Sequence, residues 1–289
     1  MGINLKEHFI AREDGVKTYI LELPAKGIET GPPIICLHGL TRSHKDFESI
    51  FATLQNYGRR VFAFDIRGRG NSDWDANPLN YNPLIYTQDV LNACAQLGIN
   101  RAVFIGTSMG GIISMLIGAY SPQLVEAMLL NDVGPEVAAE GIARIKSYVG
   151  SSSPIETWPQ AAEAIKKIAI VAFPSKENDE AFWSDFARKT CVLKDGKFVF
   201  NYDPAISQGL KSDSAESAAP TLWPQFEMLK GIKIALVRGQ LSDILTPQII
   251  DKMIAIKPDL EVFEVPQTGH APMLDEKESL SAIEYILRN

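Results

Sequence analysis

Ser108 is the residue of this sequence best suited to covalent chemistry. It is the centre of a Gly-x-Ser-x-Gly pattern, Gly106 to Gly110, with a short apolar segment before it and an apolar stretch of helical spacing after it. This context predicts a sharp turn from a strand into a helix. The glycines would leave the hydroxyl accessible, and the first-turn N–H groups would favour negative charge beside it. The pattern predicts a serine nucleophile, and the alternative is a glycine-rich turn whose serine only caps the helix.

Such a serine needs a base, and the base needs a carboxylate partner. His270 lies in a loop before the last helical segment, and Asp132 and Asp243 each follow an apolar segment. Histidine titrates near neutral pH and can accept the serine proton, while a carboxylate fixes its tautomer and stabilises its cation. Both aspartates precede His270 in the chain, so order and strand position leave the choice of acid open.

The elements that must position these residues are strands alternating with helices. This alternation predicts right-handed βαβ crossovers and a mostly parallel sheet, preceded by a hairpin over 6–12 and 16–23. Because the carboxyl ends of parallel strands border one crevice, the serine, the acids and the histidine are expected to meet there. The expected strands are 34–37, 61–64, 101–106, 125–130, 232–237 and 260–265, and the expected helices are 44–57, 83–97, 109–120, one from about 247, and 273–287.

The alternation stops at Gly134-Pro135 and resumes at Ile232. The stretch between them predicts amphipathic helices near 135–149, 155–172 and 178–190 and a small hairpin over 194–200. We therefore expect a helical cap over 135–222, inserted into a core formed by 1–134 and 223–289. A helical layer on one sheet face is the alternative. Aromatic residues here could line a pocket, although most are expected to pack: Trp158, Phe173, Phe182, Trp183, Phe186 and Trp223.

Composition and charge exclude several other classes of protein. The net charge of −7 over 289 residues, with no basic cluster, disfavours a nucleic-acid partner. No apolar run approaches the roughly 20 residues that span a bilayer, and the N-terminus lacks a secretory pattern, so no membrane partner is expected. Cys36, Cys94 and Cys191 are far apart in apolar surroundings. Reduced core thiols and a cytoplasmic location are therefore expected.

Metal and nucleotide sites are also disfavoured. The four histidines form no His-x-x-x-His pair, so no zinc site is expected. Gly68 and Gly70 resemble part of a dinucleotide fingerprint, but Asp73 stands at the third glycine position. A rigid loop is the better interpretation. His38 is expected to support its loop through hydrogen bonds, and His44 is expected at the surface.

Taken together, these motifs resemble the α/β-hydrolase family across nearly the whole chain. They are His38-Gly39 after an early strand, the turn from Gly106 to Gly111, an acid-bearing loop, and Gly269-His270 before the last helix. The resemblance implies an α/β fold, with a mostly parallel sheet of the eight-stranded type flanked by helices. Serine at position 108 departs from the haloalkane dehalogenase and epoxide hydrolase branches, which place an aspartate there.

The resemblance also implies roles for individual residues. Ser108 would be the nucleophile and His270 the base, with the backbone N–H groups of Leu40 and Met109 forming the oxyanion hole. In most relatives the acid follows the strand after the cap, which favours Asp243, with Asp132 as the alternative. No cofactor and no metal are implied, since acyl transfer on this scaffold uses side chains and backbone donors.

The expected activity is hydrolysis of a small-molecule carboxylic ester, lactones included, through an acyl-serine intermediate. The same residues also serve C–C bond hydrolases of ring-cleavage products, because function resides in the pocket and not in the fold. A hydrolase-derived ligand receptor with little turnover is a further alternative. The sequence carries no signal of oligomeric state.

Overall fold

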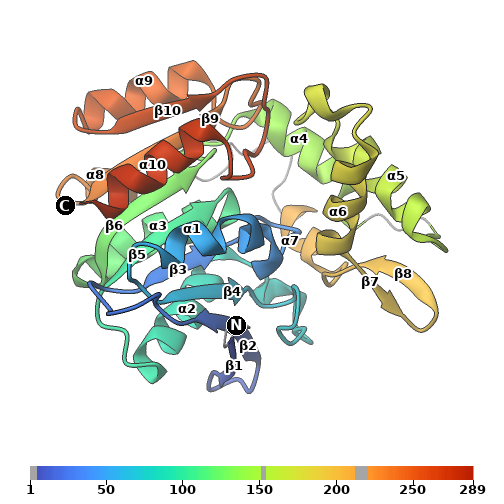
Figure 1. Cartoon of the computed structure of the whole chain (residues 1–289), viewed down its shortest axis with the longest axis horizontal. Helices are drawn as coiled ribbons and strands as arrows, with labels where there is room; N and C mark the ends of the chain where they lie inside the picture. The colour runs from blue at the N-terminus through green and yellow to red at the C-terminus, as the bar shows by residue number, and fades with distance from the viewer. Residues whose placement is uncertain (1–4, 151–153, 212–220, 289) are drawn as a thin grey trace.

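Eight strands form one sheet in the computed structural model, which describes residues 5–150, 154–211 and 221–288 (Figure 1). Their order is β1-β2-β4-β3-β5-β6-β9-β10. β2 runs antiparallel to β1 and β4, and the strands from β4 to β10 are mutually parallel. The bounds are β1 Lys6–Ala11, β2 Lys17–Leu23, β3 Ile34–Leu37, β4 Val61–Asp65, β5 Ala102–Thr107, β6 Val125–Asn131, β9 Lys233–Gly239 and β10 Glu261–Val265.

Helices cover both faces of this sheet, which explains why β3, β4 and β5 are almost continuously apolar and buried. One face packs against α2, α3, α8 and α9, and the other against η1, α1 and α10. The bounds are η1 His44–Ile50, α1 Phe51–Gln55, α2 Pro83–Gln96, α3 Met109–Tyr120, α8 Trp223–Glu227, α9 Pro247–Ile256 and α10 Lys277–Leu287, with short 3₁₀ turns at η2 Pro78–Asn80 and η3 Pro122–Leu124.

The predicted fold class is confirmed, with small differences at element ends. The helix expected over 44–57 is a 3₁₀ helix followed by one short α-helix. The sequence pattern does not separate the two forms, because both place apolar residues three or four positions apart. The closing helix begins at Lys277 and not at Met273.

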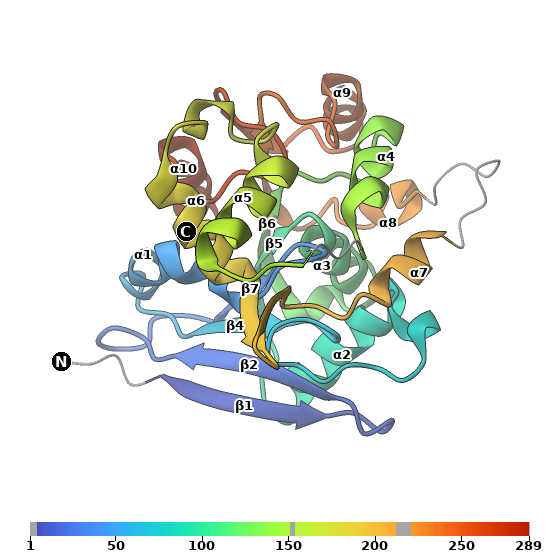
Figure 2. The ribbon, with the colours of Figure 1, turned by 90° about the vertical axis from the view of Figure 1, so that its right-hand side faces the viewer.

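A second group of elements lies between β6 and α8, apart from the sheet (Figures 1 and 2). We call α4 to α7, with η4 and the hairpin β7-β8, the inserted elements. Residues 151–153 and 212–220 of the predicted cap lie outside the described residues, and the cap boundaries stay a prediction. The bounds are α4 Ala139–Tyr148, α5 Trp158–Ala169, η4 Pro174–Lys176, α6 Glu180–Thr190, β7 Cys191–Lys194, β8 Lys197–Phe200 and α7 Ile206–Lys211.

The inserted elements are tied to the core by backbone hydrogen bonds. Gly70 N donates to Asn201 O at 3.0 Å, and Asp203 N donates to Gly68 O at 2.8 Å. Gly269 N donates to Ala172 O at 2.7 Å. The loop after β4 and the loop after β10 therefore hold the inserted elements over the carboxyl ends of the strands.

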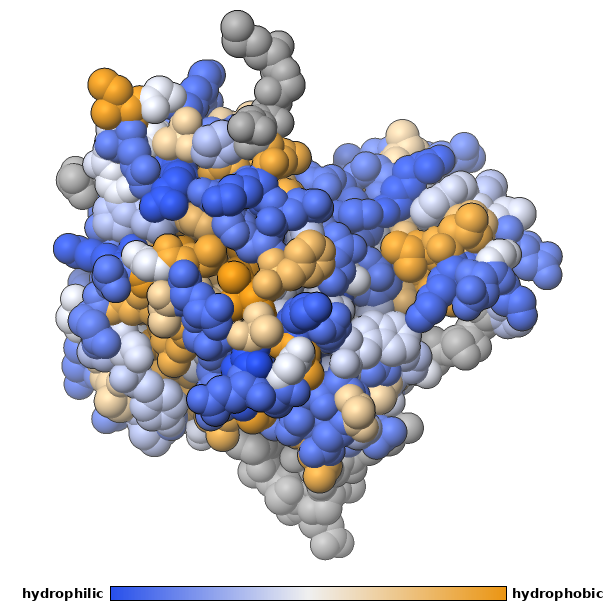
Figure 3. Space-filling view, turned by 90° about the horizontal axis from the view of Figure 1, so that it is seen from below, coloured by the Kyte–Doolittle hydropathy of each residue, from blue (hydrophilic) through white to orange (hydrophobic). Residues whose placement is uncertain are grey.

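The surface shown in Figure 3 is mostly hydrophilic, with apolar residues in separate small patches. Within the described ranges, no helix has the length and apolar character needed to cross a bilayer. The same residues contain no group of three or more acidic, histidine or cysteine side chains arranged to hold a metal ion. All three cysteines are buried and unpaired.

Candidate active site

The turn between β5 and α3 holds Ser108 in a strained backbone conformation. Its φ of 51° and ψ of −114° lie in a region that non-glycine residues rarely adopt. A Cβ at Gly106 would come within 2.5 Å of the Gly110 backbone, and a Cβ at Gly110 within 2.0 Å of the carbonyl oxygen of Leu37. Glycine is therefore required at both positions for α3 to pack this closely on β3 and β5. This is the strand–turn–helix context that the sequence predicted.

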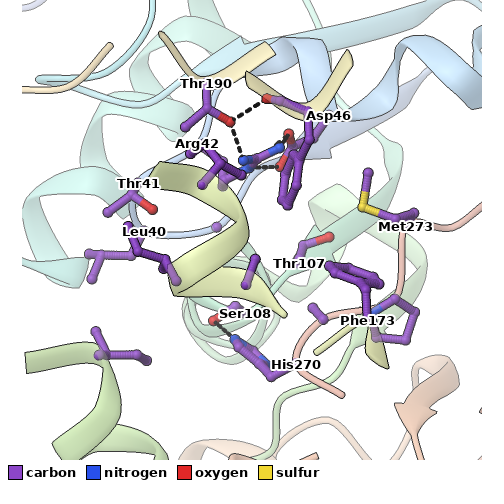
Figure 4. A pocket seen from close by; sticks show the side chains of 18 of the residues that line it. Leu40, Thr41, Arg42, Asp46, Thr107, Ser108, Phe173, Thr190, His270 and Met273 are labelled. Carbon is purple, nitrogen blue, oxygen red and sulfur yellow. Dashed lines mark hydrogen bonds and ion pairs between the residues drawn. The ribbon is translucent and has the colours of Figure 1, made fainter. Parts of the chain in front are cut away.

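Ser108, His270 and Asp132 form one hydrogen-bonded chain. Nε2 of His270 lies 2.9 Å from Oγ of Ser108 (Figure 4), and Nδ1 of His270 lies 2.8 Å from Oδ2 of Asp132. The carboxylate is fully buried and the imidazole is nearly so. This order of groups allows the imidazole to accept the serine proton while the carboxylate stabilises the resulting cation.

Asp132 is held by the loop that follows β9. Its Oδ1 accepts a hydrogen bond from Gly239 N at 2.9 Å, and its Oδ2 accepts one from Ser242 Oγ at 2.6 Å. Asp132 has a positive φ of 55°, which aspartate tolerates better than most residues. With His270, these donors satisfy both oxygens of the buried carboxylate. The sequence analysis did not identify Ser242 as a hydrogen-bond donor to Asp132. Its position in the same loop as Asp243, which was considered as the acid, is the sequence feature that could have indicated it.

The preference for Asp243 as the partner of His270 is wrong. Asp243 binds Arg144 of α4 through two hydrogen bonds, 2.5 Å from Nε to Oδ2 and 2.8 Å from Nη2 to Oδ1. Burial opposes ionisation of Asp243, but these bonds and the charge of Arg144 outweigh it and hold the pKa of Asp243 below its usual value. Asp243 therefore joins the core to the inserted elements, and the alternative acid, Asp132, is the hydrogen-bond partner of His270.

The two residues expected to supply the oxyanion hole flank Ser108. The loop after β3 runs beside the serine, since a Cβ at Gly39 would lie 3.8 Å from the Cβ of Ser108. Leu40, the next residue, lines the cavity above Ser108. Met109 is the first residue of α3, where a backbone N–H has no partner within the helix. Their roles as donors to an oxyanion stay a prediction.

A cavity of about 140 Å³ opens above Ser108 and His270 (Figure 4). Its walls come from the core loops and from the inserted elements, and they are mainly apolar. Arg42, Asp46, Arg144 and Tyr148 provide polar groups that the sequence analysis did not predict. The apolar lining includes Leu40, Phe47, Ile145, Ile165, Ile168, Phe173, Phe186, Phe200, Met273 and Leu274.

Only some of the aromatic residues considered for this pocket reach it. Phe173 and Phe186 line the cavity. Trp158, Phe182 and Trp183 instead pack in the apolar cluster shared by the inserted helices. Trp223 lies apart, where its Nε1 donates to Oε2 of Glu136 at 2.7 Å. Amphipathic spacing predicts that aromatic residues are covered, but not which of them border a cavity.

Two histidines outside the hydrogen-bonded chain are buried. His38 supports its loop as expected, with Nδ1 donating to Gly39 O at 2.7 Å and Nε2 accepting from Ile66 N at 2.9 Å. His44 was expected at the surface, but it is buried against Asp65, with Nδ1 2.9 Å from Oδ1. Asp65, the last residue of β4, is buried and holds His44 in the interior, because its carboxylate binds both the backbone N–H and the ring of His44.

His38 predicts a pH dependence of stability. Burial lowers the pKa of His38 to about 4 from 6.5, so between these values the unfolded chain binds a proton that the folded protein does not. The contribution of His38 is therefore complete above pH 6.5 and is lost as the pH falls toward 4. The free energy of unfolding should drop by about 2 kcal/mol from this group between pH 7 and 5.

Urea denaturation at both pH values measures this loss. His38→Gln should be less stable at pH 7 and should lack this part of the pH dependence, whereas His8→Gln, at a half-buried histidine, should retain it. Equal pH slopes for the wild type and His38→Gln would contradict the prediction.

Comparison with known proteins places the chain in a family. Residues 34–282 match the model of the alpha/beta hydrolase family. The chain is 31% identical over 248 residues to a 3-hydroxybutyrate-oligomer hydrolase of Cupriavidus necator, covering 83% of this chain and 82% of that protein. It is 24% identical over 264 residues to a 2-(acetamidomethylene)succinate hydrolase of Mesorhizobium japonicum, covering 91% and 90%.

One solved structure matches the fold of this chain over nearly its whole length. The crystal structure of an alpha/beta hydrolase from Novosphingobium aromaticivorans superposes with a TM-score of 0.90 at 37% identity, covering 99% of each chain. The family match, this superposition and the strand order of the sheet lead to the same conclusion. The chain belongs to the α/β hydrolase family and is an enzyme of its hydrolase type.

Proposed function

We propose that this enzyme hydrolyses carboxylic esters of small molecules through an acyl-serine intermediate. The observation that carries the proposal is the chain from Oγ of Ser108 through His270 to Asp132, at a strained turn beneath a cavity. Ser108 is the nucleophile, His270 is the general base and Asp132 is the acid that orients it.

The reaction then follows from the positions of these groups. Oγ of Ser108 attacks the ester carbonyl carbon while Nε2 of His270 takes the hydroxyl proton. The imidazolium returns that proton to the leaving alcohol as the C–O bond breaks. Water, deprotonated by the same histidine, attacks the acyl-serine, and the imidazolium returns that proton to Oγ of Ser108 as the acid is released. The N–H groups of Leu40 and Met109 would bind the oxyanion of each tetrahedral intermediate.

The inserted elements are proposed to act as a cap that selects the substrate. Residues of α4, α5 and α6 line the cavity above Ser108, while the catalytic groups lie on the sheet. The mainly apolar lining favours an acyl chain of modest size. The 31% identical relative is named for 3-hydroxybutyrate oligomers, which supports short oligoesters of hydroxy acids as the first substrates to test.

A hydrolysis screen tests this function. The panel contains p-nitrophenyl esters of increasing chain length, 3-hydroxybutyrate dimer and trimer, lactones and dienone-type C–C substrates. We expect turnover of short esters and of the hydroxybutyrate oligomers, with equal amounts of acid and alcohol formed. Turnover confined to C–C substrates, or one burst of p-nitrophenol without further turnover, would contradict the proposal.

Phe173→Ala is expected to move the preference toward longer acyl chains. Phe173 lines the cavity above Ser108 and also a second cavity that faces Lys176 and Glu276, so truncation should join the two. The ratio of kcat/KM for a long ester to that for a short ester should rise by about tenfold. Phe182→Ala is the matched control, because Phe182 borders the second cavity and is not among the residues that line the cavity above Ser108. An unchanged ratio in Phe173→Ala would show that this wall does not contact the acyl chain.

A further inference from the structure

Arg69 is a fully buried cation in the loop after β4. None of the described residues places a carboxylate within ion-pair distance of it, whereas its equally buried neighbour Arg67 binds Asp89, Asp75 and Asp14. A buried guanidinium without a carboxylate partner is costly, and this invites a functional explanation.

The contacts of Arg69 converge on the proposed oxyanion hole. Its Nε donates to the carbonyl oxygen of Leu40 at 2.8 Å, and its Nη2 lies 3.8 Å from Sδ of Met109. The remaining nitrogen, Nη1, donates to Arg67 O at 2.6 Å and to the hydroxyl of Tyr86 at 2.9 Å. One side chain therefore contacts both residues whose N–H groups are proposed to bind the oxyanion.

Two tyrosine rings and a backbone bridge hold Arg69 in this position. Its guanidinium lies over the ring of Tyr86, 4.8 Å from the centroid, and 5.7 Å from the ring centroid of Tyr81. These ring faces partly compensate the buried charge without neutralising it. Its backbone forms an isolated β-bridge with Tyr202, which lines the cavity.

We propose that Arg69 is a positioning residue that sets and polarises the oxyanion hole. The proposal rests on the proposed function. By binding the carbonyl of Leu40 and the side chain of Met109, it fixes the loop after β3 relative to the start of α3. Its positive charge lies beside the two residues proposed to bind the oxyanion, and in a buried environment that charge is only weakly screened. It should stabilise the transition state more than the bound substrate.

The experiment compares variants at two neighbouring buried arginines. Arg69→Met removes the charge and the hydrogen bonds, Arg69→Gln keeps a neutral donor, and Arg69→Lys keeps the charge. Arg67→Met is the matched control, because Arg67 is equally buried but pairs with carboxylates. Active sites are counted by titration with a fluorophosphonate, and kcat and KM are measured on an activated ester. The inhibition constant of a trifluoromethyl ketone, which forms an anionic tetrahedral adduct, is measured beside that of the product acid.

The expected results separate positioning from structural support. Arg69→Met should lower kcat per titrated site by about 100-fold with KM changed less than about threefold. Arg69→Lys should exceed Arg69→Gln in kcat by about tenfold. Ketone affinity should fall in step with kcat, while affinity for the product acid should not. Arg67→Met should lower the melting temperature but leave kcat per titrated site nearly unchanged.

Other outcomes would overturn the proposal. Wild-type kcat in Arg69→Met, an equal loss in Arg67→Met, or equal values for the Lys and Gln variants would each do so. If only Arg69→Lys folds, it decides alone: a single ammonium cannot bind both Leu40 and Met109, so unchanged kcat and ketone affinity would refute the role. Failure of the proposed function is distinct, since the wild type itself would then not turn over esters, whereas failure of the role of Arg69 appears only in the comparison of variants with an active wild type.

Discussion

Ser108→Ala is expected to abolish ester hydrolysis, with kcat falling by about 10⁶-fold, as in serine hydrolases that lose their nucleophile. The reason is that His270 has no hydroxyl to deprotonate, so no acyl-enzyme forms. A small residual rate over the uncatalysed reaction would come from the oxyanion hole and substrate binding alone. Initial rates on the best substrate of the screen provide the measurement.

Covalent labelling supplies an independent readout of the same prediction. A fluorophosphonate should add once to the wild type, with the adduct mapped by mass spectrometry to Ser108, and should not add to Ser108→Ala. Ser114→Ala is the control, because Ser114 is buried in α3 and its hydroxyl only donates to Gly110 O at 2.8 Å. That variant should keep its activity and its label. An adduct at another residue, or activity in Ser108→Ala, would remove Ser108 from the mechanism.

Asp132→Asn is expected to lower kcat by about 10⁴-fold, because an amide no longer fixes the imidazole tautomer or stabilises its cation. Asp243→Asn should cost less than about tenfold, since Asp243 binds Arg144 at the edge of the cavity and has no hydrogen bond to His270. Both rates are measured on one activated ester. The comparison matches two aspartates that each follow a strand of the same sheet.

Folding must be checked in both variants. Asp132→Asn also weakens the acceptor for Gly239 N and Ser242 Oγ, so its thermal midpoint should fall along with its rate. Ser242→Ala serves as a control that removes one of these bonds and leaves the carboxylate, and it should retain most of the rate. A larger loss in Asp243→Asn than in Asp132→Asn would reverse the assignment of the acid.

Local patterns in the sequence are sufficient for the fold class and for the turn at Ser108. The glycines at 106 and 110 stand within two residues of the serine, and the close approach that requires Gly106 is to the Gly110 backbone of the same short segment, whereas Gly110 approaches Leu37 of β3. The parallel strands are equally recognisable, because burial on both faces demands continuous apolar residues. The position of His270 beside Ser108 could be predicted because His270 follows the last strand of such a sheet.

Which aspartate binds His270 depended on tertiary structure. Asp132 and Asp243 have the same local context, and the hydrogen bond that separates them joins residues 138 positions apart. Which side chain reaches His270 depends on the positive φ of Asp132 and on how the loop after β9 folds back over it. No periodicity encodes either feature.

The contacts of Arg69 and the composition of the cavity walls also depend on long-range packing. Gly68 and Gly70 mark a rigid loop in the sequence, but only the packing of that loop against the one after β3 brings the guanidinium to Leu40. The cavity walls come from elements separated by most of the chain, so their composition is set by how the inserted helices lie over the sheet. Local sequence determines which residues can do chemistry, and long-range packing determines which of them meet.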